Sequence, residues 1–191
     1  MAHLSILGTG NMGQAIAALA GKGAHTVQLL GSNDVDAEVT GDIVVLAIPH
    51  PAVSDVIAQR GDQLAGKVVV DITNPLNFET FDSLVVPADS SAAADIAAVL
   101  PNSRVLKAFN TTFAATLAAG TVGPLTTTVL IAGDDADAKS TLAGIITSGG
   151  LNAIDAGSLA RARELEALGF LQITLAAGER VSWTDGFAIV A

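Results

Sequence analysis

The first twenty residues join a short apolar stretch to a helix-like segment through three closely spaced glycines. The apolar stretch covers residues 3–7, the glycines are Gly8, Gly10 and Gly13, and apolar residues then recur at the spacing of one helix face. A strand that enters a helix through a glycine turn is the opening unit of a doubly wound α/β sheet. This feature constrains the fold more than any other in the chain.

The remaining segments fit the same class. Strand-like runs follow at residues 25–30, 42–48, 67–72, 104–109 and 126–133, and most of them are apolar throughout. Alanine-rich, helix-like segments separate most of them, which predicts a parallel sheet covered on both faces, an α/β fold of the Rossmann type. Only 11 residues separate Leu30 from Asp42, so we expect a turn or a short helix there in place of a full crossover.

The last part of the chain has a different pattern. Residues 159–180 form one long helix candidate, and residues 167–177 of it have only Gln172 and Thr174 as polar side chains. A helix that is apolar nearly all round must be buried on more than one side, so we expect a homodimer through it. Residues 186–191 are typical of a final edge strand. We therefore predict one nucleotide-binding domain, 1–191, in which 157–191 form a C-terminal helix-and-strand appendage.

Composition excludes several classes of function. The formal net charge is −10, which argues against nucleic acid and anionic membrane as partners, because binding to them needs clustered Lys and Arg. The chain has no cysteine, so thiol chemistry is excluded, and its three scattered histidines predict no metal site. No window of 18 residues lacks charged and turn residues, and no basic leader precedes residue 3; we expect a cytoplasmic protein.

The glycine spacing predicts a dinucleotide site. Gly8 would permit the tight turn, Gly10 would leave room for a pyrophosphate, and Gly13 would let the helix lie close to the sheet. The free N–H groups at the helix N-terminus attract an anion without basic side chains, which suits a chain with one Lys and no Arg in its first 59 residues. The alternative is that the glycines serve only a tight turn.

The end of the second predicted strand bears on which dinucleotide is bound. NAD-binding proteins place an Asp or Glu there for the ribose 2′-OH, but this chain has Gly31, Ser32 and Asn33. Ser32 and Asn33 could donate hydrogen bonds to a 2′-phosphate, although Asp34 and Asp36 follow and no cation stands beside them. These residues favour NADP and leave NAD possible; the alternative is that they form only a turn.

Several motifs along nearly the whole chain resemble the deazaflavin-dependent NADP oxidoreductase family and its short dinucleotide-binding relatives. They are ILGTGNMGQAIA, GSN, DIVVLAIPHPAV, VVVDITNPL, VLKAFNTT and ARELEALGFLQITLA. The resemblance implies hydride transfer between NADP(H) and coenzyme F420 or a flavin. The family tends to have Arg where this chain has Asn33, and this departure bears on how strongly NADP is selected.

The resemblance also assigns residues to the cofactor, from the pyrophosphate through the adenosine ribose to the nicotinamide and the floor beneath it. These are, in that order, Thr9, Gly10, Asn11 and Met12; Ser32 and Asn33; Ile48, Pro49 and His50; and Asn74, Pro75 and Asn110. Independently, Pro49, Thr73 and Asn110 directly follow predicted strands, where open α/β sheets bind their ligands. The long segment 74–89 could form an apolar wall over a flat ring, or a surface loop.

Hydride transfer between two flat rings requires their reacting carbons about 3–3.5 Å apart and little else. His50 and Asn74 are the candidate catalytic residues, and the alternative for His50 is that it orders a turn between two prolines. Lys107, inside a predicted strand, could form a structural ion pair or reach a phosphate. The predicted function is that of an NADP(H)-dependent oxidoreductase acting on a flavin or deazaflavin; the alternative is a non-catalytic NADP(H)-binding sensor or scaffold.

Overall fold

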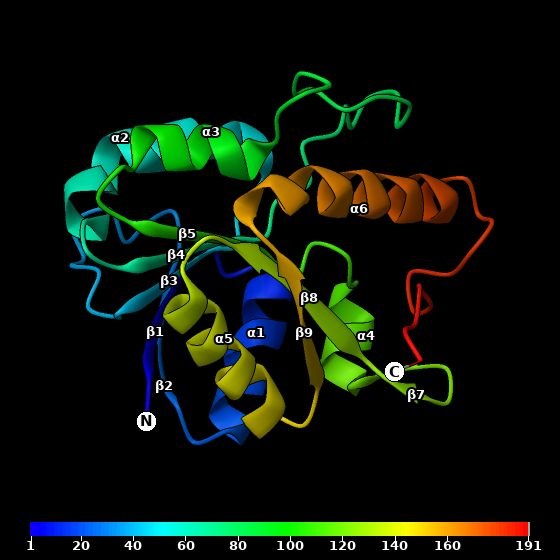
Figure 1. Cartoon of the computed structure of the whole chain (residues 1–191), viewed down its shortest axis with the longest axis horizontal. Helices are drawn as coiled ribbons and strands as arrows, with labels where there is room; N and C mark the ends of the chain where they lie inside the picture. The colour runs from blue at the N-terminus through cyan, green and yellow to red at the C-terminus, as the bar shows by residue number, and fades with distance from the viewer. Residues whose placement is uncertain (191) are drawn as a thin grey trace.

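A computed structural model describes residues 1–190 and places helices on both faces of a seven-stranded sheet (Figure 1). The strand order is β2-β1-β3-β4-β5-β8-β9. These strands are β1 (His3–Leu7), β2 (Thr26–Leu30), β3 (Ile43–Leu46), β4 (Val68–Asp71), β5 (Arg104–Ala108), β8 (Thr128–Gly133) and β9 (Asn152–Gly157). The helices are α1 (Asn11–Lys22), α2 (Val53–Leu64), α3 (Ala92–Val99), α4 (Ala114–Ala119), α5 (Ala136–Ser148) and α6 (Ala162–Ala177). Helices α1, α4 and α5 cover one face, and α2, α3 and α6 cover the other.

The first five strands form the predicted parallel sheet. Leu4 of β1 pairs with Ile43 of β3, and Val69 of β4 pairs with Val105 of β5. Every residue of β3 and β4 is buried, as expected for strands covered on both faces. No helix lies between β2 and β3, which confirms the shortened second connection.

The other two strands run in the opposite direction to the rest of the sheet. Strand β8 pairs antiparallel with β5, and β9 pairs parallel with β8. The connection from β5 to β8 contains only the six-residue α4 and a hairpin of β6 (Thr121–Val122) and β7 (Leu125–Thr126). A parallel strand needs a connection that carries the chain back along the sheet, but α4 and this hairpin do not return it to the start of β5. Strand β8 therefore begins beside the end of β5 and runs antiparallel to it. The predicted α/β sheet is confirmed and is mostly parallel, with β5–β8 as its antiparallel pair among the described residues; β9, largely polar or half-exposed, was not predicted.

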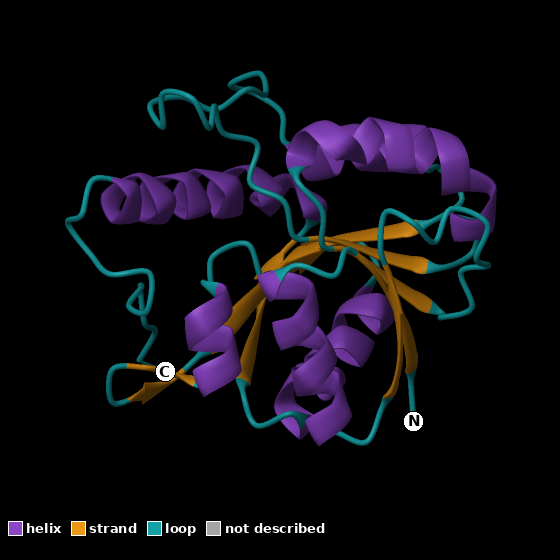
Figure 2. Ribbon diagram, turned by 180° about the vertical axis from the view of Figure 1, so that it is seen from behind, coloured by secondary structure: helices purple, strands orange, loops and turns teal. Residues whose placement is uncertain are grey.

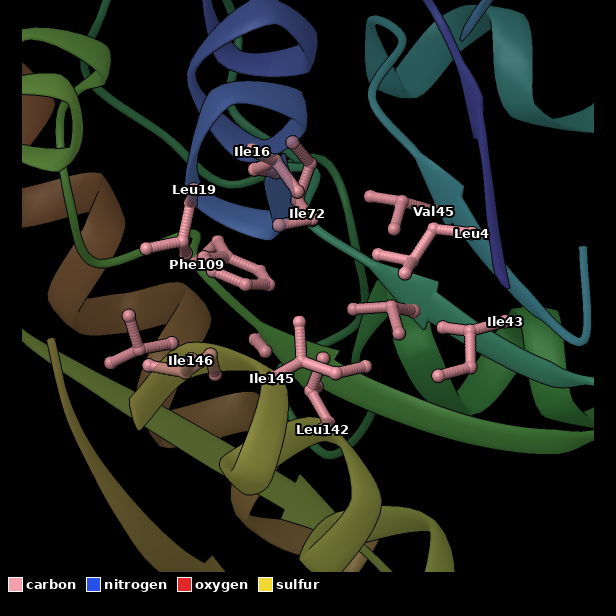
Figure 3. Packing of buried hydrophobic residues seen from close by; sticks show 14 of the residues in the cluster. Leu4, Ile16, Leu19, Ile43, Val45, Ile72, Phe109, Leu142, Ile145 and Ile146 are labelled. Carbon is pink, nitrogen blue, oxygen red and sulfur yellow. The ribbon is translucent and has the colours of Figure 1, made fainter. Parts of the chain in front are cut away.

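Apolar side chains fill the space between the sheet and the helices on each face. On the α1 face, Ile16 and Leu19 lie near Ile145 and Ile146 of α5, with Phe109 and Ile72 between α1 and the strand ends (Figure 3). On the α2 face, a second cluster contains Val44, Leu46, Val69, Leu64 and Ile96. Burial of these side chains fixes the carboxyl ends of β1, β3, β4 and β5 at one edge of the sheet.

The C-terminal segment departs from the predicted strand. A 3₁₀ turn, Leu159–Arg161, precedes α6, and the described residues 178–190 form a loop (Figure 2). Strand β9 already occupies the sheet edge, and the tail is held elsewhere: Trp183 packs on Phe113 with ring centroids 5.0 Å apart, and Phe187 N–H donates to Gln172 Oε1. The predicted edge strand at 186–191 is therefore wrong for residues 186–190, and residue 191 lies outside the described residues.

None of the helices within residues 1–190 is long and apolar enough to cross a membrane.

Candidate functional site

The glycine turn shows which of its glycines the protein itself requires. Gly8 has φ +118°, and a Cβ there would collide with the carbonyl oxygen of Ala47. A Cβ at Gly13 would strike the carbonyl oxygen of Gly8. At Gly10, by contrast, φ is −71° and a Cβ would meet no atom within 4 Å. The packing of this chain therefore accounts for Gly8 and Gly13, whereas Gly10 faces open space.

The N-terminus of α1 opens onto that space. Gly10 is the N-cap residue, no side chain caps the helix, and the first turn holds no acidic residue. The first helical amides, from Asn11 onward, are therefore free to bind an anion, and the helix dipole favours one. Thr9 and Asn11 are exposed around the turn, and Thr9 lies next to Gly31 at the end of β2.

A slot of about 240 Å³ lies beside the turn, on the side of β2 and α2. Ser32 lines it, and so do Ile48 and Pro49 after β3, while Asn33 is exposed on the same turn. The structure thus brings Ile48 and Pro49 to the Ser32 side of the site, whereas the resemblance assigned them to the nicotinamide.

His50 lies apart from the glycine turn and from this slot. It begins the 3₁₀ turn His50–Ala52 and lines a separate cavity with Asp95 and Ile96 of α3. The interpretation of His50 as an ordering residue between two prolines fits this position better than a role in hydride transfer.

A cavity of about 410 Å³ lies at the carboxyl ends of β4 and β5. Its lining is mostly apolar or amide: Asn11, Met12, Ile72, Asn74, Phe78, Phe109, Asn110, Thr112, Phe113, Ala114, Ala115, Ile173 and Trp183. Asn11 and Met12 come from the start of α1, so this cavity adjoins the glycine turn. The sequence did not identify Phe113, Ile173 or Trp183 as site residues. Phe113 precedes α4, and the folded chain brings Ile173 of α6 and Trp183 of the tail to the same cavity.

Two asparagines form the floor of this cavity. Asn110 Nδ2 donates to Asn74 Oδ1 at 3.0 Å and to the carbonyl of Leu165 at 2.8 Å, and Asn74 Nδ2 donates to the carbonyl of Asn110 at 3.0 Å. The other amide atom, Asn110 Oδ1, is buried and has no hydrogen-bond partner among residues 1–190. Pro75 is buried outside the lining, and its carbonyl accepts a hydrogen bond from Val85 N–H, which anchors the segment after β4.

A strained turn places Asn110 there. Phe109 has φ +63°, in the left-handed region, and Asn110 N–H donates to the carbonyl of Ala108 at 2.8 Å. A hydrogen bond across two residues with positive φ at the centre is the rare, strained form of γ-turn. Such strain, of order 1–3 kcal/mol, persists where surrounding contacts impose it and is concentrated at functional sites.

Behind the floor lies a wholly buried charge cluster. Lys107 Nζ lies 2.7 Å from Asp71 Oδ2, 2.9 Å from Glu166 Oε1 and 2.6 Å from the carbonyl oxygen of Thr73. Glu166 also accepts hydrogen bonds from the N–H groups of Ala92 and of Ala93 at the start of α3. This cluster fastens α6 and α3 to β4 and β5, so Lys107 is a structural ion-pair residue.

Among residues 1–190, no three or more His, Asp or Glu side chains gather as metal ligands would.

Known proteins resemble this chain in sequence and in fold. The family described as coenzyme F420-dependent NADP oxidoreductase matches residues 24–75. The F420-dependent NADP reductase of Methanocaldococcus jannaschii is 33% identical over 151 residues, which are 77% of this chain and 67% of that protein. The metalloreductase STEAP3 of Rattus norvegicus is 38% identical over 112 residues, 59% of this chain and 22% of that protein.

A crystal structure from Arthrobacter sp. FB24 superposes with a TM-score of 0.84 at 24% identity and covers 98% of this chain and 99% of its own. That likeness shows the same fold over nearly the whole length of both chains.

Proposed function

Because this chain belongs to the coenzyme F420-dependent NADP oxidoreductases, we propose that it binds NADP(H) across the carboxyl edge of β1–β5 and exchanges hydride with a deazaflavin. As a member of this family it is an NAD(P)-dependent oxidoreductase. The observation that carries the proposed binding mode concerns Gly10. No neighbouring atom would obstruct a Cβ at this position, so packing does not explain the glycine, and Gly10 is the N-cap of a helix whose N-terminus has no side-chain cap.

In this proposal the nucleotide extends from the slot to the cavity. The first amides of α1 bind the pyrophosphate, and Ser32 and Asn33 contact the adenosine ribose and its 2′-phosphate. The nicotinamide enters the 410 Å³ cavity over Asn74 and Asn110. Asn74 holds the Asn110 side chain in place, so the two amides form a fixed polar floor beneath the nicotinamide.

The cavity suits hydride transfer better than acid–base chemistry. No Asp, Glu, His, Lys or Arg is among the residues that line it. When bound, the nicotinamide supplies or receives the hydride. The walls of Phe113, Trp183 and Phe78 offer flat apolar surfaces against which a tricyclic ring can stack.

The nucleotide half of the proposal is tested with Gly10→Val. Because the added side chain finds free space in the protein, the variant should fold, but the side chain would occupy the place of the pyrophosphate. NADPH affinity, measured by fluorescence titration, should fall by more than about tenfold, over 1.4 kcal/mol. Gly21→Val is the matched control, because Gly21 lies in the last turn of the same helix and is equally unobstructed. Unchanged NADPH affinity in Gly10→Val would refute the assignment.

The acceptor is tested by following NADPH oxidation with coenzyme F420, FMN and FAD. The proposal predicts turnover with the deazaflavin, and a preference for FMN or FAD would make the acceptor a flavin. Tight NADPH binding without oxidation by any of the three would favour the sensor or scaffold.

We also propose a cytoplasmic homodimer in which α6 contributes to the interface. Leu171 on α6 is about half exposed, as are Trp183 and Phe187 on the tail beyond it. Sedimentation of the wild type and of Leu171→Lys tests this, and a monomeric wild type would contradict it.

A further inference from the structure

The slot beside the glycine turn contains an arginine whose charge the protein does not compensate. Arg60 of α2 lines this slot together with Gly8, Ser32 and Pro49. Under the proposed function, on which this inference rests, the adenosine end of the nucleotide lies here. The resemblance places an arginine of the family at position 33, but Asn33 is uncharged and Asp34 and Asp36 follow it.

The Arg60 guanidinium holds the turn that follows β2. Nη1 donates to the carbonyl of Ala37 at 2.6 Å, and Nη2 donates to the carbonyl of Asp34. The residue is only 5% exposed. Its planar fork therefore fixes two points of the loop that carries Ser32 and Asn33.

These contacts satisfy hydrogen bonds but leave the charge unbalanced. Carbonyl oxygens carry no net charge, and Arg60 forms no ion pair with a carboxylate of residues 1–190. The Asp34 carboxylate is used elsewhere, as it accepts a hydrogen bond from Gly31 N–H at 2.7 Å. Buried charges in proteins are normally paired, as Lys107 is here by two carboxylates. An arginine buried without an anion, in the wall of a slot, points to an anionic ligand.

The chemistry of that anion follows from the arginine. Two of the five guanidinium N–H groups are used by the carbonyls, so three remain. A phosphate monoester carries up to two negative charges and three acceptor oxygens, which match both the charge and the spare donors. We propose that Arg60 is the residue that selects NADP(H) over NAD(H), because it supplies from α2 the positive charge for the 2′-phosphate that position 33 lacks.

The test uses nucleotides without redox chemistry. Binding of 2′,5′-ADP and of 5′-ADP is measured by isothermal titration calorimetry on the full chain, for the wild type and for Arg60→Gln, Arg60→Met and Arg60→Lys. Arg60→Met keeps the volume of the stem without its charge and serves if Arg60→Gln does not fold. Arg104→Gln is the matched control. Arg104 also donates to a carbonyl, that of Gly66, but it lies at the amino end of β5, whereas the candidate site lies at the carboxyl ends of the strands.

The wild type should prefer 2′,5′-ADP, and loss of the charge should weaken that ligand by about tenfold while 5′-ADP changes by less than about twofold. Arg60→Lys, which keeps the charge, should retain most of the preference, and Arg104→Gln all of it. Equal weakening of both nucleotides in the neutral variants would show a structural role and overturn the inference. A wild type that binds neither nucleotide would instead refute the proposed function itself.

Discussion

Replacement of Lys107 by Met should destabilise the protein far more than loss of a surface ion pair. The substitution removes the one cation of the buried cluster and leaves the carboxylates of Asp71 and Glu166 inside the protein. Both side chains are at most 1% exposed, so water cannot replace the ammonium. Breaking a buried ion pair from one side costs about 3–5 kcal/mol, and here two acidic partners are stranded at once.

Urea unfolding followed by circular dichroism measures this cost. The matched control is Lys139→Met, because Lys139 Nζ lies 2.8 Å from Asp155, whose side chain is 58% exposed. An ion pair exposed in this way contributes about 0–1 kcal/mol. On thermal unfolding, the midpoint of Lys107→Met should fall by roughly 6–20 °C for a domain of this size. If Lys107→Met lost no more stability than Lys139→Met, the view that this cluster fastens the helices to the sheet would be untenable.

Three further outcomes are expected from the same structure. Glu166→Gln leaves one ammonium against one carboxylate and should cost about 1–2 kcal/mol, less than removal of the lysine; a larger loss in urea would contradict this charge count. Gly169→Ala places a Cβ against Asn74 Oδ1 and should lower kcat for hydride transfer about tenfold or more, with NADPH affinity less affected; unchanged kcat would show that the floor tolerates displacement. The hydrogen bond from Lys139, together with that from Gly157 N–H, holds the pKa of Asp155 below its ordinary value of 3.8. The contribution of the Asp155 carboxylate to stability is therefore present above pH 3.8 and is lost as the pH falls through the lowered pKa. In an NMR titration, Lys139→Met should bring this pKa back toward 3.8, and no change would contradict the assignment.

The nucleotide half of the fold was predictable because its signals are local. Gly8 and Gly13 are demanded by contacts within one strand–turn–helix unit, and the apolar runs of β3 and β4 report burial on both faces. The short connection from Leu30 to Asp42 indicated by its length alone that a turn or a short helix, and no full crossover helix, follows β2.

The other half depends on contacts between distant segments. Nothing in residues 128–133 distinguishes a parallel from an antiparallel strand, because the direction is set by how far α4 and the hairpin carry the chain. The predicted edge strand at 186–190 failed because β9 had already taken the sheet edge. Similarly, Phe113 meets Trp183 only in the folded chain, across 70 positions of sequence.

Some residues of the candidate site could likewise be predicted from the sequence, and others could not. Ser32 and Asn110 follow strands and could be placed by counting, whereas Arg60 lies within α2 and gave no signal as a cofactor residue. Its role becomes visible only when the structure shows which carbonyls it meets and that no carboxylate balances it. His50 is the opposite case: its position after a strand suggested a role in the chemistry, but the structure places it in a separate cavity beside Asp95 and Ile96 of α3.

The tail after α6 can change in sequence without altering the glycine turn or the sheet. Trp183 forms part of the wall of the 410 Å³ cavity from a loop. Its ring packs on Phe113, and nearby Phe187 N–H donates a hydrogen bond to Gln172 Oε1. Under the proposed function, substitutions there would reshape the space for the second substrate while the glycine turn and the sheet stay intact. A lineage could therefore drift from one electron acceptor to another through a dozen surface residues, at little risk to folding.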